Sequence, residues 1–361
     1  MAQSEFDSVD KKLLNLLQSD FPLVREPWKA LGEKANVSEQ EVLDRVAVLK
    51  KKNVVRQIGA IFDTRRLGYS STLVAMRFAD DKLDAAAHML NAHPGISHNY
   101  ARNGYFNLWF TLAVPPGRTV ADEGEVLAEA SGAEATRLLP TIRFFKIGVN
   151  FDMEKKVSDA RKYFVPDPSD GDEGESKKTE STSPGEGWNK AQELSEFDVA
   201  FIKELQDDLP LESRPFDPMA NRLGITVERL FEYCDEMVKR RLMRRYSAVL
   251  YHRRAGFNAN AMIVWRVPEE RAQEVGDIMA TSPAVTHCYQ RPIYDDWKYS
   301  HFTMVHATSK EECEAIARDI SEKTGIDDRM LLYSTREYKK TRVRYFVEDE
   351  FRIEELAALR A

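Results

Sequence analysis

Cysteine is scarce in this sequence of 361 residues, and its scarcity excludes several kinds of site. The three cysteines are Cys234, Cys288 and Cys313, and no two of them form a C-x-x-C pair. A disulfide framework, a zinc knuckle or an iron–sulfur site needs cysteines that are more numerous or closer together. We therefore expect no redox or metal function based on thiols.

Long apolar runs and an excess of positive charge are also absent. No segment approaches the ~18 uninterrupted apolar residues of a membrane span, and the opening MAQSEFDSVDKK lacks the apolar core of a signal peptide. The net charge is -7, so no overall positive field attracts nucleic acid. These features predict a cytoplasmic protein of two or more folded domains, without membrane contact.

The sequence does contain an internal repeat. Residues 22–69 align without a gap to residues 210–257, at a constant offset of 188. Matched pairs include Arg56 with Arg244, Arg65 with Arg253, Arg66 with Arg254, and Gly68 with Gly256. Between the repeats, residues 165–195 are acidic, rich in Pro, Gly and Ser, and poor in aliphatic residues, which predicts a flexible linker. The repeat predicts an internal pseudo-dimer whose halves pair about a two-fold axis.

Each half begins with a helical pattern. In the first half, Ser38 is expected to cap a helix whose apolar face carries Val42, Val46 and Leu49. The equivalent helix of the second half follows Thr226 and carries Leu230, Cys234 and Met237 at the same spacing. The pattern predicts two helix-turn-helix domains, over residues 1–56 and 196–245.

The period then becomes that of strands. In the first half, strands are expected at 58–63, 71–78, 96–102, 107–114 and 138–151, with helices at 81–92 and 121–131. This is the βαββαβ order of a ferredoxin-like domain, preceded by one strand. We assign such domains to residues 57–164 and 246–361, so the predicted fold is α+β, as a tandem repeat of helix-turn-helix and ferredoxin-like domains.

Three segments carry a resemblance to the Lrp/AsnC family of regulators: VSEQEVLDRVAVLKKKNVV, IGAIFDTRRLGY and HPGISHNYARNGYFNLWF. The resemblance implies a helix-turn-helix joined to a ferredoxin-like ligand-binding domain. A DNA-reading helix presents its N-terminal end to bases and phosphates. Here that end carries Glu39, Glu41 and Asp44, and the helical segments are nearly balanced in charge. Specific DNA binding is therefore not expected.

The chain is more closely similar to the siroheme decarboxylases, through LPTIRFFKIGVNFD, YSTREYKKTRVRYF and YHRRAGFNANAMIVW. The resemblance implies a carboxy-lyase of heme biosynthesis that removes CO2 from two acetate side chains of siroheme without oxidation. It implies no cofactor beyond the substrate's iron, and leaves open further self-association or a second decarboxylase subunit. Two alternatives remain at this point: a regulator that senses a small ligand, and a non-catalytic tetrapyrrole-binding protein.

A His-x-Tyr-x-Arg pattern occurs once in each half, at residues 98–102 and 287–291. Because strand side chains alternate between faces, each trio should line one face. Arginine suits carboxylates, tyrosine and tryptophan offer flat walls to a macrocycle, and histidine can move a proton or bind iron. Carbon dioxide loss leaves carbanion character beside a conjugated ring, and a proton must quench it.

The longer insertion before His301 and the extra histidines place the expected chemistry in the second half. As catalytic residues we predict His287, His301, Arg291 and Tyr289, with His287 or His301 as a possible ligand of the siroheme iron. His301 and Trp109 are expected on the open face of the sheet, and Phe110, Leu112, Phe302 and Met304 on the helix-covered face. Substrate-binding candidates are Arg336, Lys339, Tyr294, Trp297, Arg344, His98, Tyr100, Arg102, Trp109, Arg143 and Lys146.

The other histidines are given structural interpretations. His306 falls on the presumed core face, His88 and His93 border a helix as surface or capping residues, and His252 lies in a loop. Arg65, Arg66, Arg253 and Arg254 are read as solvated turn residues that could also reach carboxylates.

Overall fold

The computed structural model describes residues 6–19, 21–147, 151–152, 157–158, 190–250 and 259–347. Most of the predicted linker lies outside these residues, as do His252, Arg253 and Arg254.

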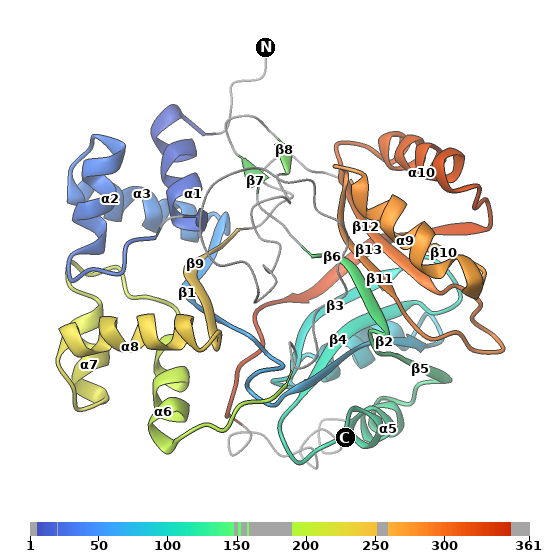
Figure 1. Ribbon diagram of the computed structural model, residues 1–361, viewed down its shortest axis with the longest axis horizontal. Coiled ribbons are helices and arrows are strands. Elements are labelled where there is room, and N and C mark those ends of the chain that lie inside the picture. The colour runs from blue at the N-terminus through green and yellow to red at the C-terminus, as the bar shows by residue number, and fades with distance from the viewer. Residues whose placement is uncertain are drawn as a thin grey trace.

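Two three-helix domains lie side by side at one end of the molecule (Figure 1). Their helices are α1 (Ser8–Ser19), α2 (Pro27–Ala35), α3 (Glu39–Lys51), α6 (Glu196–Leu205), α7 (Phe216–Arg222) and α8 (Val227–Lys239). The predicted caps are confirmed, because the Ser38 and Thr226 side chains accept hydrogen bonds from the backbone N–H groups of Glu41 and Arg229. The predicted apolar faces of α3 and α8 are buried as well.

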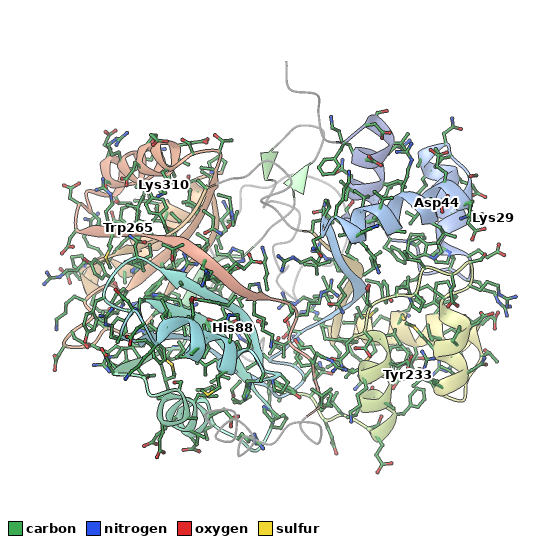
Figure 2. All side chains as sticks on the ribbon, turned by 180° about the vertical axis from the view of Figure 1, so that it is seen from behind. Lys29, Asp44, His88, Tyr233, Trp265 and Lys310 are labelled. Carbon is green, nitrogen blue, oxygen red and sulfur yellow. The ribbon has the colours of Figure 1, made fainter. Side chains whose placement is uncertain are left out.

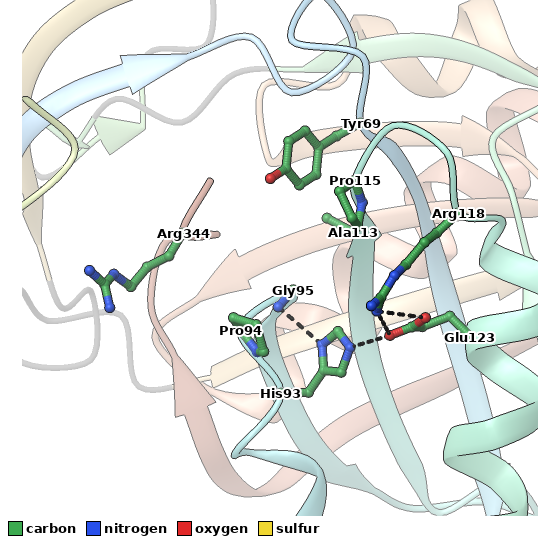
Figure 3. A pocket seen from close by; sticks show the side chains of 9 residues that line it. All are labelled: Tyr69, His93, Pro94, Gly95, Ala113, Pro115, Arg118, Glu123 and Arg344. Carbon is green, nitrogen blue, oxygen red and sulfur yellow. Dashed lines mark hydrogen bonds and ion pairs between the residues drawn. The ribbon is translucent and has the colours of Figure 1, made fainter. Parts of the chain in front are cut away.

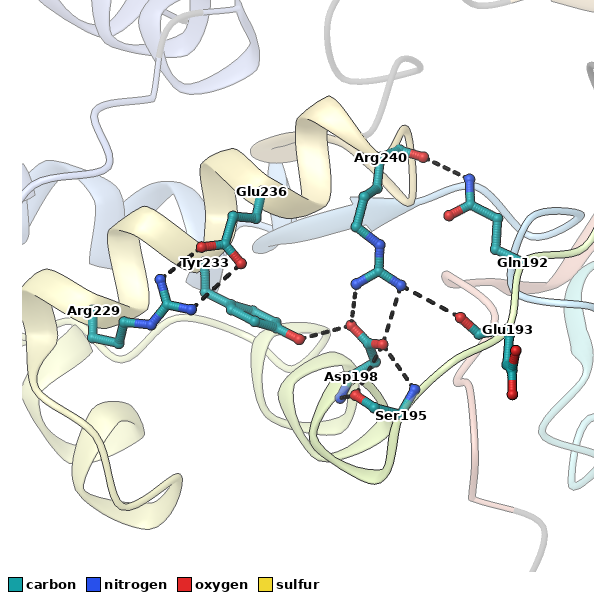
Figure 4. A network of polar contacts seen from close by, with 8 residues as sticks. All are labelled: Gln192, Glu193, Ser195, Asp198, Arg229, Tyr233, Glu236 and Arg240. Carbon is teal, nitrogen blue, oxygen red and sulfur yellow. Dashed lines mark hydrogen bonds and ion pairs between the residues drawn. The ribbon is translucent and has the colours of Figure 1, made fainter.

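A buried carboxylate holds the second helical domain together (Figure 4). Asp198 accepts hydrogen bonds from the Tyr233 hydroxyl at 2.8 Å and from Arg240 Nη1 at 2.6 Å, and it completes a capping box with Ser195. Burial raises the pKa of Asp198, but the hydrogen bonds from Arg240 and its other partners outweigh burial and lower that pKa to about 2. Arg240, at the C-terminal end of α8, is therefore held by Asp198.

A two-stranded ribbon joins the helical domains to the rest of the molecule. Strand β1 (Val55–Phe62) pairs antiparallel with β9 (Met243–Leu250), and both pack into the core of the six helices. The expected first strand of each half thus lies apart from the main sheet and belongs to the helical end.

The main sheet has nine strands in the order β5-β2-β4-β3-β13-β10-β12-β11-β6. Its strands are β2 (Ser70–Arg77), β3 (Ile96–Arg102), β4 (Leu108–Val114), β5 (Ala135–Leu139), β6 (Arg143–Ile147), β10 (Ala259–Trp265), β11 (Val285–Gln290), β12 (His301–Ala307) and β13 (Arg329–Lys340). Two further short strands, β7 (Phe151–Asp152) and β8 (Val157–Ser158), pair with each other.

The last strand of each half crosses to the other half. Strand β13 pairs first with β10 and then, from Ser334, with β3 of the first half. Its counterpart is interrupted at Pro140, which cannot donate to a ladder, so the expected strand at 138–151 is split into β5 and β6. Strand β5 pairs with β2, and β6 pairs with β11 of the second half. The sheet therefore curls back toward its own start, and the two halves share it.

Helices cover the outer side of this curled sheet. The first half uses α4 (Leu83–Leu90) and α5 (Val120–Ser131), and the second uses α9 (Ala272–Thr281), which follows the short helix η3 (Glu269–Arg271), and α10 (Lys310–Thr324). On the inner side, Trp109 and Leu139 meet Val264 and Phe302 in one apolar cluster. The predicted βαββαβ order and the predicted pairing of the two halves are confirmed, and the structure shows that the inner, open sheet faces meet.

No helix among the described residues is long and apolar enough to cross a membrane.

Candidate functional site

His287, Tyr289 and Arg291 form a stack along β11. The ring centroids of His287 and Tyr289 lie 6.1 Å apart, and the Arg291 guanidinium carbon lies 4.9 Å from the Tyr289 centroid. An irregularity in pairing between Val285 and His287 precedes the stack, as in a β-bulge that re-aims the next side chain. The predicted alternation thus places all three on one face.

The first half repeats this arrangement on β3. The centroids of His98 and Tyr100 lie 6.4 Å apart, the Arg102 guanidinium carbon lies 5.5 Å from the Tyr100 centroid, and the same pairing irregularity precedes His98. Both trios face inward, because Tyr100 pairs with Trp109 and Tyr289 pairs with Phe302, which belong to the inner cluster.

The two arginines bind across the pseudo-dimer. Arg102 Nη1 donates to the Leu332 carbonyl at 2.8 Å, and Arg291 Nη1 donates to the equivalent Leu139 carbonyl of the other half. Within the described part of the chain, no carboxylate bonds the Arg291 guanidinium, whose Nε is buried without a hydrogen-bond partner. Burial lowers the pKa of Arg291 to about 10. A half-buried guanidinium with an enclosed Nε and no carboxylate partner favours an anionic ligand.

Three histidines lie within electrostatic reach of one another on this inner side. Burial lowers the pKa of His287 to about 4, and those of His98 and His306 to about 3. His287 further lowers the pKa of both other histidines, and Lys340 does the same. All three rings are therefore neutral at pH 7, the form that can ligate a metal.

Two further arginines surround the second-half stack. Arg65 and Arg244 lie close enough to Tyr289 to oppose the rise in its pKa that burial causes. Arg244 donates to Asp63 at 2.7 Å and is about half exposed, and burial lowers the pKa of Arg65. The internal repeat is the sequence feature that points to these residues, because Arg65 and Arg244 both have matched partners in the other half. The sequence interpretation treats Arg65 as a turn residue that could also reach carboxylates, and it assigns no role to Arg244.

Aromatic side chains close the arginine end of the inner side. Trp297 lies 5.4 Å from Trp109 and 5.8 Å from Phe106 between ring centroids, and Tyr294 donates to the Leu138 carbonyl. Tyr294, Trp297 and Trp109 thus lie together in the inner apolar cluster, beside the carbonyl that Arg291 bonds. Their contact with substrate stays a prediction.

The expectation that His301 faces the open side is wrong. His301 is fully buried on the outer side, where Nε2 contacts the Ala272 carbonyl at 2.9 Å and Nδ1 contacts the Ser300 hydroxyl at 3.0 Å. Its ring stacks on Phe145 with centroids 5.5 Å apart. With both ring nitrogens engaged behind the sheet, His301 has no path to a ligand on the inner face.

The error is a shift of one residue in the alignment of β4 with β12. Tyr100 pairs with Trp109 and Tyr289 with Phe302, so Trp109 corresponds to Phe302. A shift of one residue reverses every side chain on a strand. Phe302 and Met304 therefore face inward instead of packing under the helices, and His306 joins the inner histidines instead of the core.

Arg336 and Lys339 also face outward, against the prediction that they bind substrate. Arg336 pairs with the exposed Asp84, and Lys339 Nζ donates to the carbonyls of Asn91 and His93, at 2.7 and 3.0 Å, at the end of α4. Burial lowers the pKa of Lys339 to about 8. Lysine at a helix C-terminus satisfies carbonyls that have no partner within the helix.

Their first-half counterparts behave alike. Lys146 Nζ donates to the Ser282 carbonyl at 2.8 Å, at the end of α9. Arg143 pairs in register with Gln290, and its charge lowers the pKa of the outer His301. The repetition of arginine and lysine thus reflects repeated helix capping and outer-face pairing.

Arg344 lies near a separate small pocket lined by Tyr69, His93, Glu123 and Arg118, among others (Figure 3). His93 is buried, contrary to the surface interpretation: its Nδ1 accepts from the Gly95 N–H, and its Nε2 lies 2.7 Å from Glu123 Oε1. The internal bonds of this pair indicate a structural role. Arg344 is half exposed and contacts Asp207 at 3.4 Å, away from the inner histidines. His88 is exposed on the outer helix α4 (Figure 2).

No cluster of three or more His, Cys, Asp or Glu side chains that could hold a metal occurs in the described ranges. Of the two predicted ligands of the siroheme iron, His287 lies on the inner side and His301 does not.

Two family models match the chain, and each matches it twice. The AsnC-like ligand binding domain covers residues 66–146 and 254–339, and the siroheme decarboxylase NirDL-like HTH domain covers residues 10–56 and 198–244.

The chain is similar to siroheme decarboxylases and to their subunits. The siroheme decarboxylase of Hydrogenobacter thermophilus is 39% identical over 96% of this chain and 96% of its own. The siroheme decarboxylase beta subunit of Methanosarcina barkeri is 46% identical over 42% of this chain and 99% of its own, so one subunit there corresponds to about half of this chain. The crystal structure of siroheme decarboxylase NirDL with an iron-uroporphyrin III analogue covers 98% of this chain and 100% of that chain, at 32% identity and a TM-score of 0.68.

Proposed function

Because the chain belongs to the siroheme decarboxylase family, we propose that it decarboxylates siroheme on the inner face of its second half. The reaction is that of a carboxy-lyase acting on two acetate side chains. In each step the C–C bond to the carboxylate breaks, CO2 leaves, and the electron pair remains on the methylene carbon beside the macrocycle. A proton then gives the methyl group, so no oxidant or reductant is consumed.

The observation that carries this placement is the half-buried Arg291, which is stacked on Tyr289, has an enclosed Nε and bonds no described carboxylate. A guanidinium fork in an enclosed site binds a carboxylate with two parallel hydrogen bonds. Arg65 and Arg244 add positive charge beside Tyr289 for the other carboxylates of the substrate. The aromatic wall at Trp297 and Trp109 excludes water from the arginine end.

We assign the proton transfer, or the contact with the iron, to His287. It is neutral when the site is empty, because burial and the Arg291 charge lower its pKa to about 4. An anionic substrate would offset the positive charge of Arg291 and raise that pKa, so His287 would accept a proton more readily in the complex than in the empty site. His98 and His306 lie near His287, and the charge of Lys340 lowers the pKa of both.

Each half of the chain completes the stack of the other half, a contact that two separate subunits would make between chains. The arginine of each stack bonds the last strand of the other half, so neither stack is complete in one half alone. We propose that the single chain is the working unit.

Contacts between the helical domains give no support to a DNA-binding role. Arg25, just before α2, contacts Asp217 at 3.2 Å and Glu228 at 3.5 Å in the other helical domain, and Ser213 donates to Glu39 at 2.7 Å. These contacts join the acidic N-terminal ends of α3 and α8 to the opposite domain. The absence of specific DNA binding stays a prediction, as does the cytoplasmic location.

Steady-state decarboxylation of siroheme by His287→Ala and Arg291→Ala tests the assignment. We expect His287→Ala to lower kcat by roughly 10²-fold or more, the scale of a lost proton donor. Arg291→Ala should raise KM by about tenfold or more through a lost charge-assisted bond. His88→Ala, on the outer helix α4, is the control. Wild-type kcat and KM in both inner-face variants would overturn the placement.

A further inference from the structure

The two inner-face stacks differ at two positions on the strands that pair with them. Glu337 pairs with Tyr100 in the first half, where Phe144 pairs with Tyr289 in the second. Lys340 pairs with His98, where Ile147 pairs with His287. Strand β13 therefore brings a carboxylate and an ammonium group to the first-half stack. Strand β6, its counterpart, brings neither group to the second-half stack.

The carboxylate of Glu337 is bound by an arginine. Arg56 Nη2 donates to Glu337 Oε1 at 2.6 Å, and Arg56 Nη1 donates to the Lys340 carbonyl at 2.5 Å. Only 22% of the Arg56 side chain and 17% of the Glu337 side chain are exposed, so this ion pair is largely shielded from water. Arg56 also lies close enough to His98 to lower its pKa.

The repeat partner of Arg56 is placed differently. Arg244 bonds Asp63, whose other carboxylate oxygen accepts the backbone N–H groups of Arg65 and Arg66. Asp63 follows β1 and lies outside the sheet, and the Arg244 side chain is 47% exposed. No strand residue of the second-half stack supplies an acid, because Phe144 stands where Glu337 stands in the first half.

We propose that Glu337 is a built-in carboxylate that takes the place of a substrate carboxylate in the first half and leaves a latent, blocked tetrapyrrole site there. This rests on the proposed function, in which the second-half stack binds the carboxylates of siroheme. Siroheme carries the same chemical group on its rim that Glu337 presents to Arg56. A carboxylate on the same chain competes at high effective concentration and has already lost its translational freedom, so free substrate binds poorly against it.

Titration with iron uroporphyrin III, followed through its Soret absorbance, tests this proposal. We expect one equivalent per chain for the wild type and two for Glu337→Ala. Glu337→Gln keeps the side-chain volume and removes the charge, and it should likewise admit a second equivalent. Asp84→Ala is the matched control, because it removes the carboxylate from Arg336 on the opposite face of the same strand; it should bind one equivalent.

Variants of the second-half stack separate this proposal from the proposed function. Arg291→Ala should bind its one equivalent about tenfold or more weakly than the wild type, and Arg291→Ala with Glu337→Ala should regain one tight equivalent, at the first-half stack. One equivalent in both Glu337 variants, or two in the wild type, would overturn the latent site and leave the proposed function standing. Unchanged binding by Arg291→Ala, or none by the wild type, would overturn both.

Discussion

Single residues carry the chemistry of this protein, and their protonation states follow from burial. His287, His98 and His306 lie among arginines and lysines on the inner side of the sheet, where a proton is costly to accept. Because burial keeps these rings neutral in the folded protein, it should also make the free energy of unfolding depend on pH.

His287 should make stability fall as the pH is lowered. Its folded-state pKa of about 4 lies below the ordinary 6.5, so the unfolded chain takes up a proton that the folded chain refuses. The stabilisation is fully present above pH 6.5 and is lost as the pH falls toward 4. We expect His287 to account for about 1 to 2 kcal/mol of the loss between pH 7 and pH 5.

Urea unfolding of His287→Gln at both pH values measures this contribution. The variant should lose less stability on acidification than the wild type, whereas His88→Gln on the outer helix should follow the wild type. A loss in His287→Gln equal to that of the wild type would contradict the burial of this ring.

At the residue scale, the sequence predicted the two His-x-Tyr-x-Arg faces, because strand alternation needs only local spacing. It did not predict that Arg291 and Arg102 would bond the opposite half. That contact depends on the exchange of last strands, which no local pattern encodes.

Strands and helices decide which charged residues can reach the site. The segment from 138 and the segment from 331 both read as strands, and each contains an arginine and a lysine three residues apart. Their inward or outward direction depends on irregular pairing, such as the shift between Glu337 and Lys339. A single sequence does not show such shifts, so Arg336 and Lys339 were assigned to substrate although they lie on the outside.

Lys339→Ala should therefore affect stability and spare substrate binding. The change removes two hydrogen bonds to carbonyls at the end of α4, which we expect to cost about 1 to 3 kcal/mol in the free energy of unfolding. The Kd for iron uroporphyrin III should stay within twofold of the wild type. Weakened binding of tenfold or more with unchanged stability would return Lys339 to the substrate site.

The reversal of β12 has a similar origin. The second half has four more residues than the first between its arginine and its next strand, since the offset between the halves rises from 189 at His98 and His287 to 193 at Trp109 and Phe302. The alignment of Trp109 with His301 allows only three residues for this gap, and the missing residue exchanges the faces of His301 and His306. The pairing of β12 with β11, a long-range property, corrects it.

The whole molecule is a pseudo-dimer, and the interface between its two halves lies within one chain. Strand β13 binds β3, β6 binds β11, and the ribbon of β1 and β9 joins the helical domains. The repeat in the sequence predicted this pairing of halves, because two copies of one domain share the same open sheet face. The exchange of the last strands makes the association stronger than facing sheets alone would be.

Cleavage of the segment between the halves should leave them together. A protease site placed between residues 165 and 189, followed by complete cutting, should give two fragments that co-elute at the position of the intact chain in size-exclusion chromatography. The shared sheet and its inner cluster hold them without a covalent link. Separation of the fragments at micromolar concentration would show that the link, and not the sheet, maintains the pairing.

The central claim is decarboxylation at the second-half stack, and the mass of the product tests it most directly. The wild-type chain and the His287→Ala and Arg291→Ala variants are incubated anaerobically with siroheme, and the tetrapyrrole is then analysed by mass spectrometry. We predict the loss of two CO2 with the wild type, and mostly unchanged siroheme with both variants over the same time. Two losses with either variant at the wild-type rate, or none with the wild type, would contradict the account.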